Sequence, residues 1–129
     1  MNKPDVQEMI ANLTYLQELL NLTFSDVYDS YEVLENYDDD IRYTLSLNYL
    51  SMSHKSYLEF KRVYLQNELY HYEIEPLFRD YEHYRVQLKE VITKKDSNTS
   101  WLYSAMNKLT ETKKNVDDFL STWIKNYME

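Results

Sequence analysis

Two acid-x-x-His pairs are the residues whose types and spacing come closest to a catalytic site. Glu68 precedes His71 by three residues, and Asp80 precedes His83 by the same interval. In ferritin-like di-iron bundles, inward-pointing Glu-x-x-His pairs and further Glu residues hold two metal ions. Here the apolar periodicity places Glu68 and His83 well off the expected core face, and His71 and Asp80 only flank it. We therefore expect no metal site, no cofactor and no catalytic residues.

Other catalytic chemistries lack the residues they require. The chain has no Cys, which excludes a thiolate nucleophile, and no Gly, which excludes a Gly-rich phosphate-binding loop. The three His residues have no nearby Ser in a strained turn that they could activate. We expect a protein that is not an enzyme, with a di-metal carboxylate bundle as the remote alternative.

The segment from Asp26 to Asp40 is the second candidate site, because it contains seven acids and no base. Residues 1–42 hold ten acids against Lys3 and Arg42, whereas the rest of the chain is balanced, so this third carries the whole net charge of -8. Like charges at helical spacings cost a few tenths of a kcal/mol per pair, which favours a functional reason for keeping them. A solvated face that keeps the protein soluble is the alternative. The predicted binding residues are Asp26, Tyr28, Asp29, Glu32, Glu35, Tyr37, Asp38, Asp39 and Asp40.

This acidic segment predicts a protein partner with a basic surface. The charge would attract such a partner, and interleaved tyrosines are typical anchors of binding interfaces. The same charge repels nucleic acids and anionic membranes, so we expect direct binding to neither. The predicted function is that of a helical adaptor, chaperone or inhibitor, including a nucleic-acid mimic that blocks a basic site. The alternative is a structural coiled-coil protein that self-assembles.

The origin and location of the protein follow only from composition. Abundant Asn, Tyr and Lys without Gly are typical of AT-rich coding sequences, which fits low-GC bacteria, their phages or other mobile elements. The first ten residues are polar, and no apolar run approaches the ~18 residues that a membrane span needs. We therefore expect a cytoplasmic protein.

Long amphipathic helices must position these residues, because apolar side chains recur at intervals of three and four throughout the chain. We expect one all-α domain over residues 1–129, an elongated helical bundle or antiparallel coiled coil of about four long helices. The first helix should begin near Pro4, and a capping-box-like pair at Thr23 and Asp26 predicts a new start there. Its apolar stripe is Val6, Met9, Leu13, Leu16 and Leu20.

The second stripe includes polar residues and then loses its phase. Asp38 falls on it, so either the helix breaks at residues 38–40 or Asp38 finds a partner in the core. Ser56 and Glu59 form a capping-box signature, which predicts a turn over residues 51–56. The members of this stripe are Val27, Tyr31, Leu34, Asp38, Ile41, Leu45, Asn48 and Met52.

A third stripe continues in phase through Pro76 and predicts either two helices or one helix over residues 56–94 kinked near residue 75. The continuous phase favours the kinked helix. Residues 96–99 form a polar loop, and a last helix follows. The third stripe is Phe60, Val63, Asn67, Tyr70, Ile74, Leu77, Tyr81, Tyr84, Leu88 and Val91, and the last is Leu102, Ala105, Leu109, Thr112, Val116, Phe119, Trp123 and Tyr127.

Two further predictions concern burial and assembly. Polar residues on heptad stripes fix register in coiled coils, so Asp38, Asn48, Asn67 and Thr112 favour a dimer or small oligomer. Of the 14 tyrosines, four fit the stripes and should be core or core-edge residues: Tyr31, Tyr70, Tyr81 and Tyr84. Eight fit them poorly and are candidates for an interface: Tyr28, Tyr37, Tyr43, Tyr49, Tyr57, Tyr64, Tyr72 and Tyr103.

Overall fold

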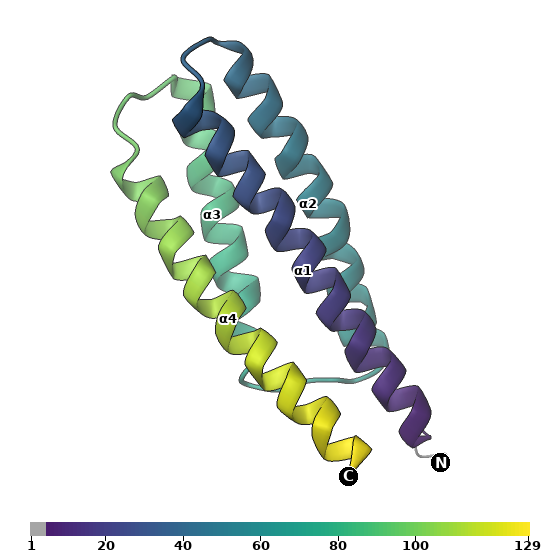
Figure 1. The fold of residues 1–129 in the computed structure, drawn as a ribbon. Coiled ribbons are helices and arrows are strands. Elements are labelled where there is room, and N and C mark those ends of the chain that lie inside the picture. The colour runs from purple at the N-terminus through teal and green to yellow at the C-terminus, as the bar shows by residue number, and fades with distance from the viewer. Residues whose placement is uncertain (1–4) are drawn as a thin grey trace.

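Four α-helices make up the computed structural model, which describes residues 5–129. They are α1 (Val6–Asn36), α2 (Ile41–Gln66), α3 (Glu75–Lys94) and α4 (Ser100–Met128). Successive helices run in opposite directions, and this arrangement confirms the predicted all-α bundle (Figure 1). The α1–α2 and α3–α4 loops lie together at one end, called the loop end below. The start of α1, the end of α4 and the α2–α3 loop lie at the other, the terminal end (Figure 1).

α1 is a single uninterrupted helix, so the predicted new start at Thr23 and Asp26 is wrong. Its first turn is capped by Asp5, whose side chain accepts a hydrogen bond from the backbone N–H of Gln7 at 3.3 Å. The expected role of Pro4 lies outside the described residues. Thr23 is buried inside the helix because it stands in phase with the leucines on either side of it. A continuous buried stripe therefore outweighs a local capping signal.

The helix break at residues 38–40 is confirmed, and the alternative of Asp38 paired in the core is wrong. Tyr37 is extended after the last turn of α1, and Asp38 is exposed in the loop. The turn predicted over residues 51–56 is also wrong, because α2 runs through it. Ser46 and Ser53 are fully buried in this helix, so its core face includes small polar residues that an apolar stripe leaves out.

Residues 56–94 form two helices rather than one kinked helix. Pro76 stands in the first turn of α3, where the missing N–H has no helical partner to lose. The chain has no Gly, and within residues 5–129 two other residues adopt left-handed backbone positions. These are Glu68 after α2, with a φ of 52°, and Lys95 at the end of α3, with a φ of 48°. The loop 96–99 and the start of the last helix lie where the sequence predicts them.

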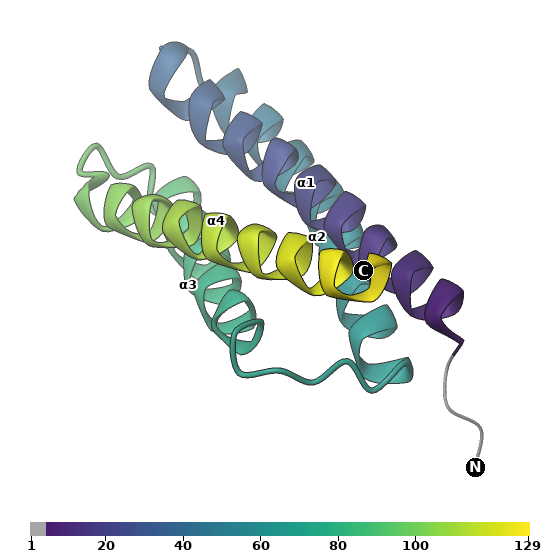
Figure 2. The same ribbon diagram turned by 60° about the horizontal axis from the view of Figure 1, so that its bottom comes forward.

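The helices approach one another unequally. α1 packs closely on α2 and also on α4, α3 packs on α4, and α2 and α3 stand apart (Figure 2). Between α1 and α2 the buried Ser46 hydroxyl donates to the carbonyl of Ser30 at 2.7 Å. Between α2 and α3, aromatic rings span the wider separation, and Tyr57 stacks on Tyr81 with ring centroids 3.9 Å apart.

Tyrosine hydroxyls on α3 reach buried serines on the other helices. The Tyr84 hydroxyl lies 2.6 Å from Ser30 Oγ on α1, and the Tyr81 hydroxyl lies 2.8 Å from Ser53 Oγ on α2. The core positions expected for Tyr81 and Tyr84 are confirmed. Tyr57 and Tyr64, expected to be hard to bury, are only 1% exposed. Tyr70, predicted as a core or core-edge residue, is 57% exposed, so that prediction is wrong.

Several other stripe positions also differ from the prediction. Val6, Ile41 and Met52 are about half exposed. Of the four polar positions expected to fix register, only Thr112 is buried, and its hydroxyl donates to the Asp80 carboxylate at 2.5 Å. The exposed ones are Asp38, Asn48 and Asn67. Asp38 is not on a buried face because α1 ends before it, and Asn67 is not because it follows the last residue of α2. Asn48 is exposed because the buried face of α2 includes Ser46 instead.

Candidate binding surface at the loop end

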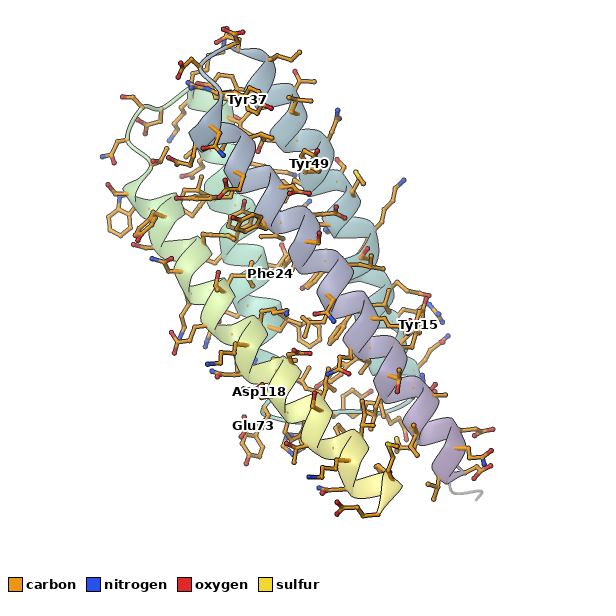
Figure 3. All side chains as sticks on the ribbon, viewed as in Figure 1. Tyr15, Phe24, Tyr37, Tyr49, Glu73 and Asp118 are labelled. Atoms are coloured by element: carbon orange, nitrogen blue, oxygen red, sulfur yellow. The ribbon has the colours of Figure 1, made fainter. Side chains whose placement is uncertain are left out.

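The nine predicted binding residues form two groups, one on α1 and one in the α1–α2 loop. Asp38, Asp39 and Asp40 are exposed in the loop, and Tyr37 lies beside them at the loop end (Figure 3). The other five occupy the second half of α1, where residues 26 and 35 are too far apart around the helix to share one narrow face. The acids therefore form a surface around the end of α1 rather than a single stripe.

The carboxylates of α1 lie beside tyrosines. The negative charge of Glu32, one turn away, raises the pKa of Tyr28, which is half exposed. Burial raises the pKa of Tyr31, and the charge of Glu35 adds to it. Asp26 is partly buried, which raises its pKa, with the charge of Asp29 as the second cause. An aromatic ring and a carboxylate thus recur together along this part of α1.

Most of these acids have no cation beside them. Within residues 5–129, Asp40 is the only one of the seven in an ion pair, with Lys95 at 3.2 Å. Arg42 instead donates to the Tyr37 carbonyl at 3.0 Å and to the Tyr43 hydroxyl at 2.9 Å. The hydrogen bond to Tyr43 and the charges of Asp38 and Asp40 raise the pKa of Arg42, so the acids left without a cation are mainly those of α1.

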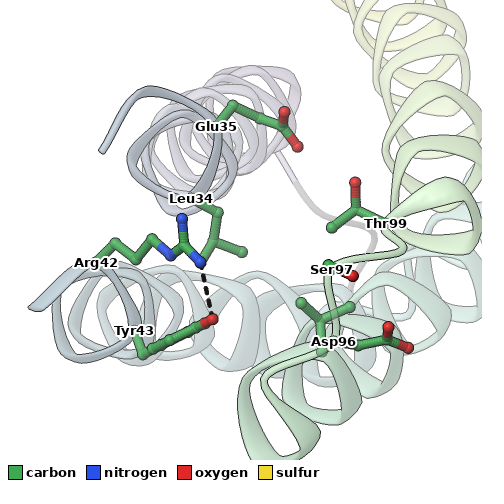
Figure 4. A pocket seen from close by; sticks show the side chains of 8 residues that line it. Leu34, Glu35, Arg42, Tyr43, Asp96, Ser97 and Thr99 are labelled. Atoms are coloured by element: carbon green, nitrogen blue, oxygen red, sulfur yellow. Dashed lines mark hydrogen bonds between the residues drawn. The ribbon is translucent and has the colours of Figure 1, made fainter. Parts of the chain in front are cut away.

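Two adjoining cavities open at the loop end between α1, α2, α4 and the α3–α4 loop. The smaller holds about 270 Å³, and Arg42 and Tyr43 lie on one wall opposite Ser97 and Thr99 (Figure 4). The larger holds about 590 Å³. Its lining residues are Tyr31, Glu35, Ser97, Asn98, Thr99, Ser100, Tyr103 and Ser104. Glu35 belongs to both cavities, so one predicted binding residue lines a hollow that the sequence did not indicate.

The acid-x-x-His pairs are dispersed by the fold. Glu68 and His83 are exposed, as expected from the periodicity. His71 stacks on Tyr72 and also approaches Phe119, with ring centroids 4.2 Å apart. Asp80 was expected only to flank the core, but it is buried and hydrogen-bonded to Thr112 on α4. Among the described residues, no group of three or more His, Cys, Asp or Glu could hold a metal ion.

A further hollow lies toward the terminal end, away from the acidic segment. Glu73 and Asp118 line it with Asn115, Phe119 and Thr122, and it holds about 310 Å³ (Figure 3).

Comparison of the chain with protein-family models, curated proteins and solved structures finds no match. Over residues 5–129, no helix combines the length and the apolarity that crossing a bilayer requires.

Proposed function

We propose that this chain is a non-enzymatic protein-binding module that uses the acidic loop end to bind a basic protein surface. The observation that carries the proposal is the interleaving of tyrosines with carboxylates on the second half of α1, which form no ion pair within residues 5–129. A basic partner would relieve the repulsion among these acids.

Charge and aromatic area would act at different stages of binding. The uncompensated acids speed the encounter with a basic partner in a manner that depends on salt. Tyr28 and Tyr37, which are about half exposed, supply area that charge alone does not, because tyrosine buries a large rigid surface at low entropic cost. The role is that of an adaptor, chaperone or inhibitor.

A charge-reversal experiment tests the proposal. Asp29, Glu32, Glu35 and Asp39 are changed together to Lys, and the helical circular dichroism spectrum should remain. Affinity capture from the native host, followed by mass spectrometry, should lose a basic partner that the unchanged protein retains. The matched control changes four exposed acids on other parts of the chain to Lys: Glu68, Glu90, Glu111 and Asp118.

The two variants carry the same change in net charge, so they separate a site from a general charge effect. Retention of the partner by the control and loss by the first variant supports the proposal. Equal binding by both variants, or equal loss, contradicts it. If the module mimics nucleic acid, duplex DNA should compete with it for the captured partner.

Self-association is a second candidate function, and it is favoured by apolar side chains exposed along α2. Leu47, Met52, Leu58 and Leu65 are between 38% and 50% exposed on this helix. A dimer or small oligomer would cover part of this area. Light scattering over a wide concentration range should then give a mass above that of the monomer, and Leu58→Glu should reduce it. A constant monomer mass excludes this candidate.

A further inference from the structure

A notch between α1 and α4 is the part of the loop end with the most specific chemistry. Figure 2 shows the two helices farther apart at the loop end than at their middle. The cavity of about 590 Å³ lies between them. Tyr31 and Glu35 are one helical turn apart on α1 and line one side, and Tyr103 of α4 lines it as well. We call this cavity the α1–α4 notch.

The α1–α4 notch has a single charge. Among its eight lining residues, Glu35 is the only charged one, and the other seven are tyrosines, serines, a threonine and an asparagine. The Asn98 side-chain oxygen is already used, since it accepts hydrogen bonds from the backbone N–H and the hydroxyl of Ser100. Within residues 5–129, Glu35 has no ion pair. The notch thus offers one carboxylate, two aromatic rings and several hydroxyl acceptors.

These groups match a guanidinium ion better than any neutral or anionic group. A carboxylate can accept two parallel N–H bonds from arginine, and the arginine plane can stack on a tyrosine face. Both interactions are stronger where part of the surrounding water is excluded. Tyr31 of α1 and Tyr103 of α4 both line the notch, so the two side chains border a common space.

The neighbouring cavity limits where a cation can be placed. Arg42 stands on its far wall, held by the Tyr37 carbonyl and the Tyr43 hydroxyl (Figure 4). An incoming cation is repelled from that wall and favoured on the side of Tyr31 and Tyr103, where no base lines the cavity. The two cavities share Glu35, Ser97 and Thr99, so Glu35 is the one acid that lines both.

We propose that the α1–α4 notch receives one arginine side chain of the basic partner, with Glu35 as its carboxylate and Tyr31 and Tyr103 as its aromatic walls. This inference rests on the proposed function, because it names the group on the basic partner that this part of the surface recognises. The inference also predicts a preference for a planar cation at one position, which a diffuse acidic surface would not show.

The probe is N-acetyl-arginine amide, with N-acetyl-citrulline amide as its neutral analogue of the same shape. Titration of the ¹⁵N-labelled protein should shift the amide signals of residues 97–104 with the arginine probe. Glu35→Gln and the citrulline probe should each weaken binding about tenfold or more, because a charge-assisted hydrogen bond is lost. Glu90→Gln, an exposed acid on α3, should leave binding unchanged. Equal shifts with citrulline, or shifts centred on residues 26–32 instead, would overturn the inference.

A variant that keeps every acid separates this inference from the proposed function. Tyr103 is 57% exposed, so Tyr103→Ala should leave the fold intact. It should weaken the arginine probe and the captured partner alike. If Tyr103→Ala retains both while the four-Lys variant loses the partner, the arginine site in the notch is wrong and the proposed function is supported. The four-Lys variant also changes Glu35, so if it retains the partner, the proposed function and the assignment of the notch to the partner's arginine are both wrong, even where Glu35→Gln loses the arginine probe.

Discussion

The interface between α1 and α2 is close and lined by serines, whereas the separation between α2 and α3 is wide and filled by tyrosines. On the close side, Ser30 and Ser46 are fully buried. On the wide side, Tyr57, Tyr81 and Phe78 form an aromatic cluster. Both sides exclude water, yet one does so by bringing the backbones together and the other by extending long side chains between them.

The two interfaces are linked because the serines of the close side also satisfy the tyrosines of the wide side. Ser30 donates to the Val27 carbonyl at 2.6 Å within its own helix and also lies beside the Tyr84 hydroxyl. A buried phenol needs such a partner, since an unpaired buried hydroxyl costs about 1–3 kcal/mol. Small polar residues here serve as spacers for one interface and as hydrogen-bond partners for the other.

Removing a buried tyrosine should have the largest effect on stability. Tyr84 is fully buried, and Tyr84→Ala would remove both the ring and the hydrogen bond to Ser30. We expect a loss of about 3–5 kcal/mol in the free energy of unfolding, as for other large aromatic truncations. Urea denaturation followed by circular dichroism would measure it. A loss below ~1 kcal/mol would show that α3 is not held by its tyrosines.

Enlarging a serine on the close side should have the next largest effect. Ser46→Leu would force α1 and α2 apart and remove the hydrogen bond to the Ser30 carbonyl, so we expect a loss of about 1–3 kcal/mol. The matched control is Ser51→Leu on the same helix, where the side chain is exposed and the change should be near neutral. Equal effects of the two substitutions in urea denaturation would contradict the close packing of this interface.

Deleting single hydroxyl groups should have smaller effects that depend on whether the hydroxyl is hydrogen-bonded. Tyr84→Phe should cost about 1 kcal/mol, because the Ser30 and Val27 oxygens lose a partner. Tyr57→Phe should be neutral or stabilising, since the buried Tyr57 hydroxyl has no hydrogen-bond partner among residues 5–129. Burial also raises the pKa of Tyr57. Thermal unfolding of the two variants side by side would reveal the difference, and the reverse order would refute the hydrogen-bond assignment.

The smallest expected effect is a pH dependence at the surface of the close side. The Tyr15 hydroxyl on α1 donates to Glu59 on α2 at 2.9 Å. Hydrogen bonds from Arg62 and Tyr15 lower the pKa of Glu59 from its ordinary value of 4.5 to about 2. Because the folded-state pKa is lowered, this contribution to stability is present above pH 4.5 and is lost as the pH falls toward 2. Glu59→Gln should therefore reduce the dependence of the melting temperature on pH over this range. An unchanged dependence would show that Glu59 does not cause it.

The sequence predicts the helices whose cores are apolar and fails where the core is polar. Leu13, Leu16 and Leu20 on α1 and Leu102 and Leu109 on α4 are buried as their spacing indicates. On α2 the inward positions include Ser46, Ser53 and Tyr57, which hydropathy does not mark as core. Their burial depends on partners such as Tyr81, distant in sequence, so no local pattern reveals it.

The candidate site, too, can be predicted from the sequence only in part. The exposed acids of the α1–α2 loop follow from charge and the helix break, both of which are local. The α1–α4 notch does not, because Tyr103 and the loop at residues 97–100 meet Glu35 only through the packing of α4 on α1. The sequence marks Tyr103 as an interface candidate, but nothing in it shows that Glu35 is its neighbour.

The antiparallel order of the four helices gives the molecule two poles, the loop end and the terminal end, which have different uses. The start of α1 and the end of α4 both lie at the pole opposite the notch (Figure 1). A label, a surface or a fused domain attached after α4 would therefore leave the acidic pole facing outward. Immobilisation through the C-terminal side should preserve binding of a basic partner, while a bulky group inserted in the α1–α2 loop should block it.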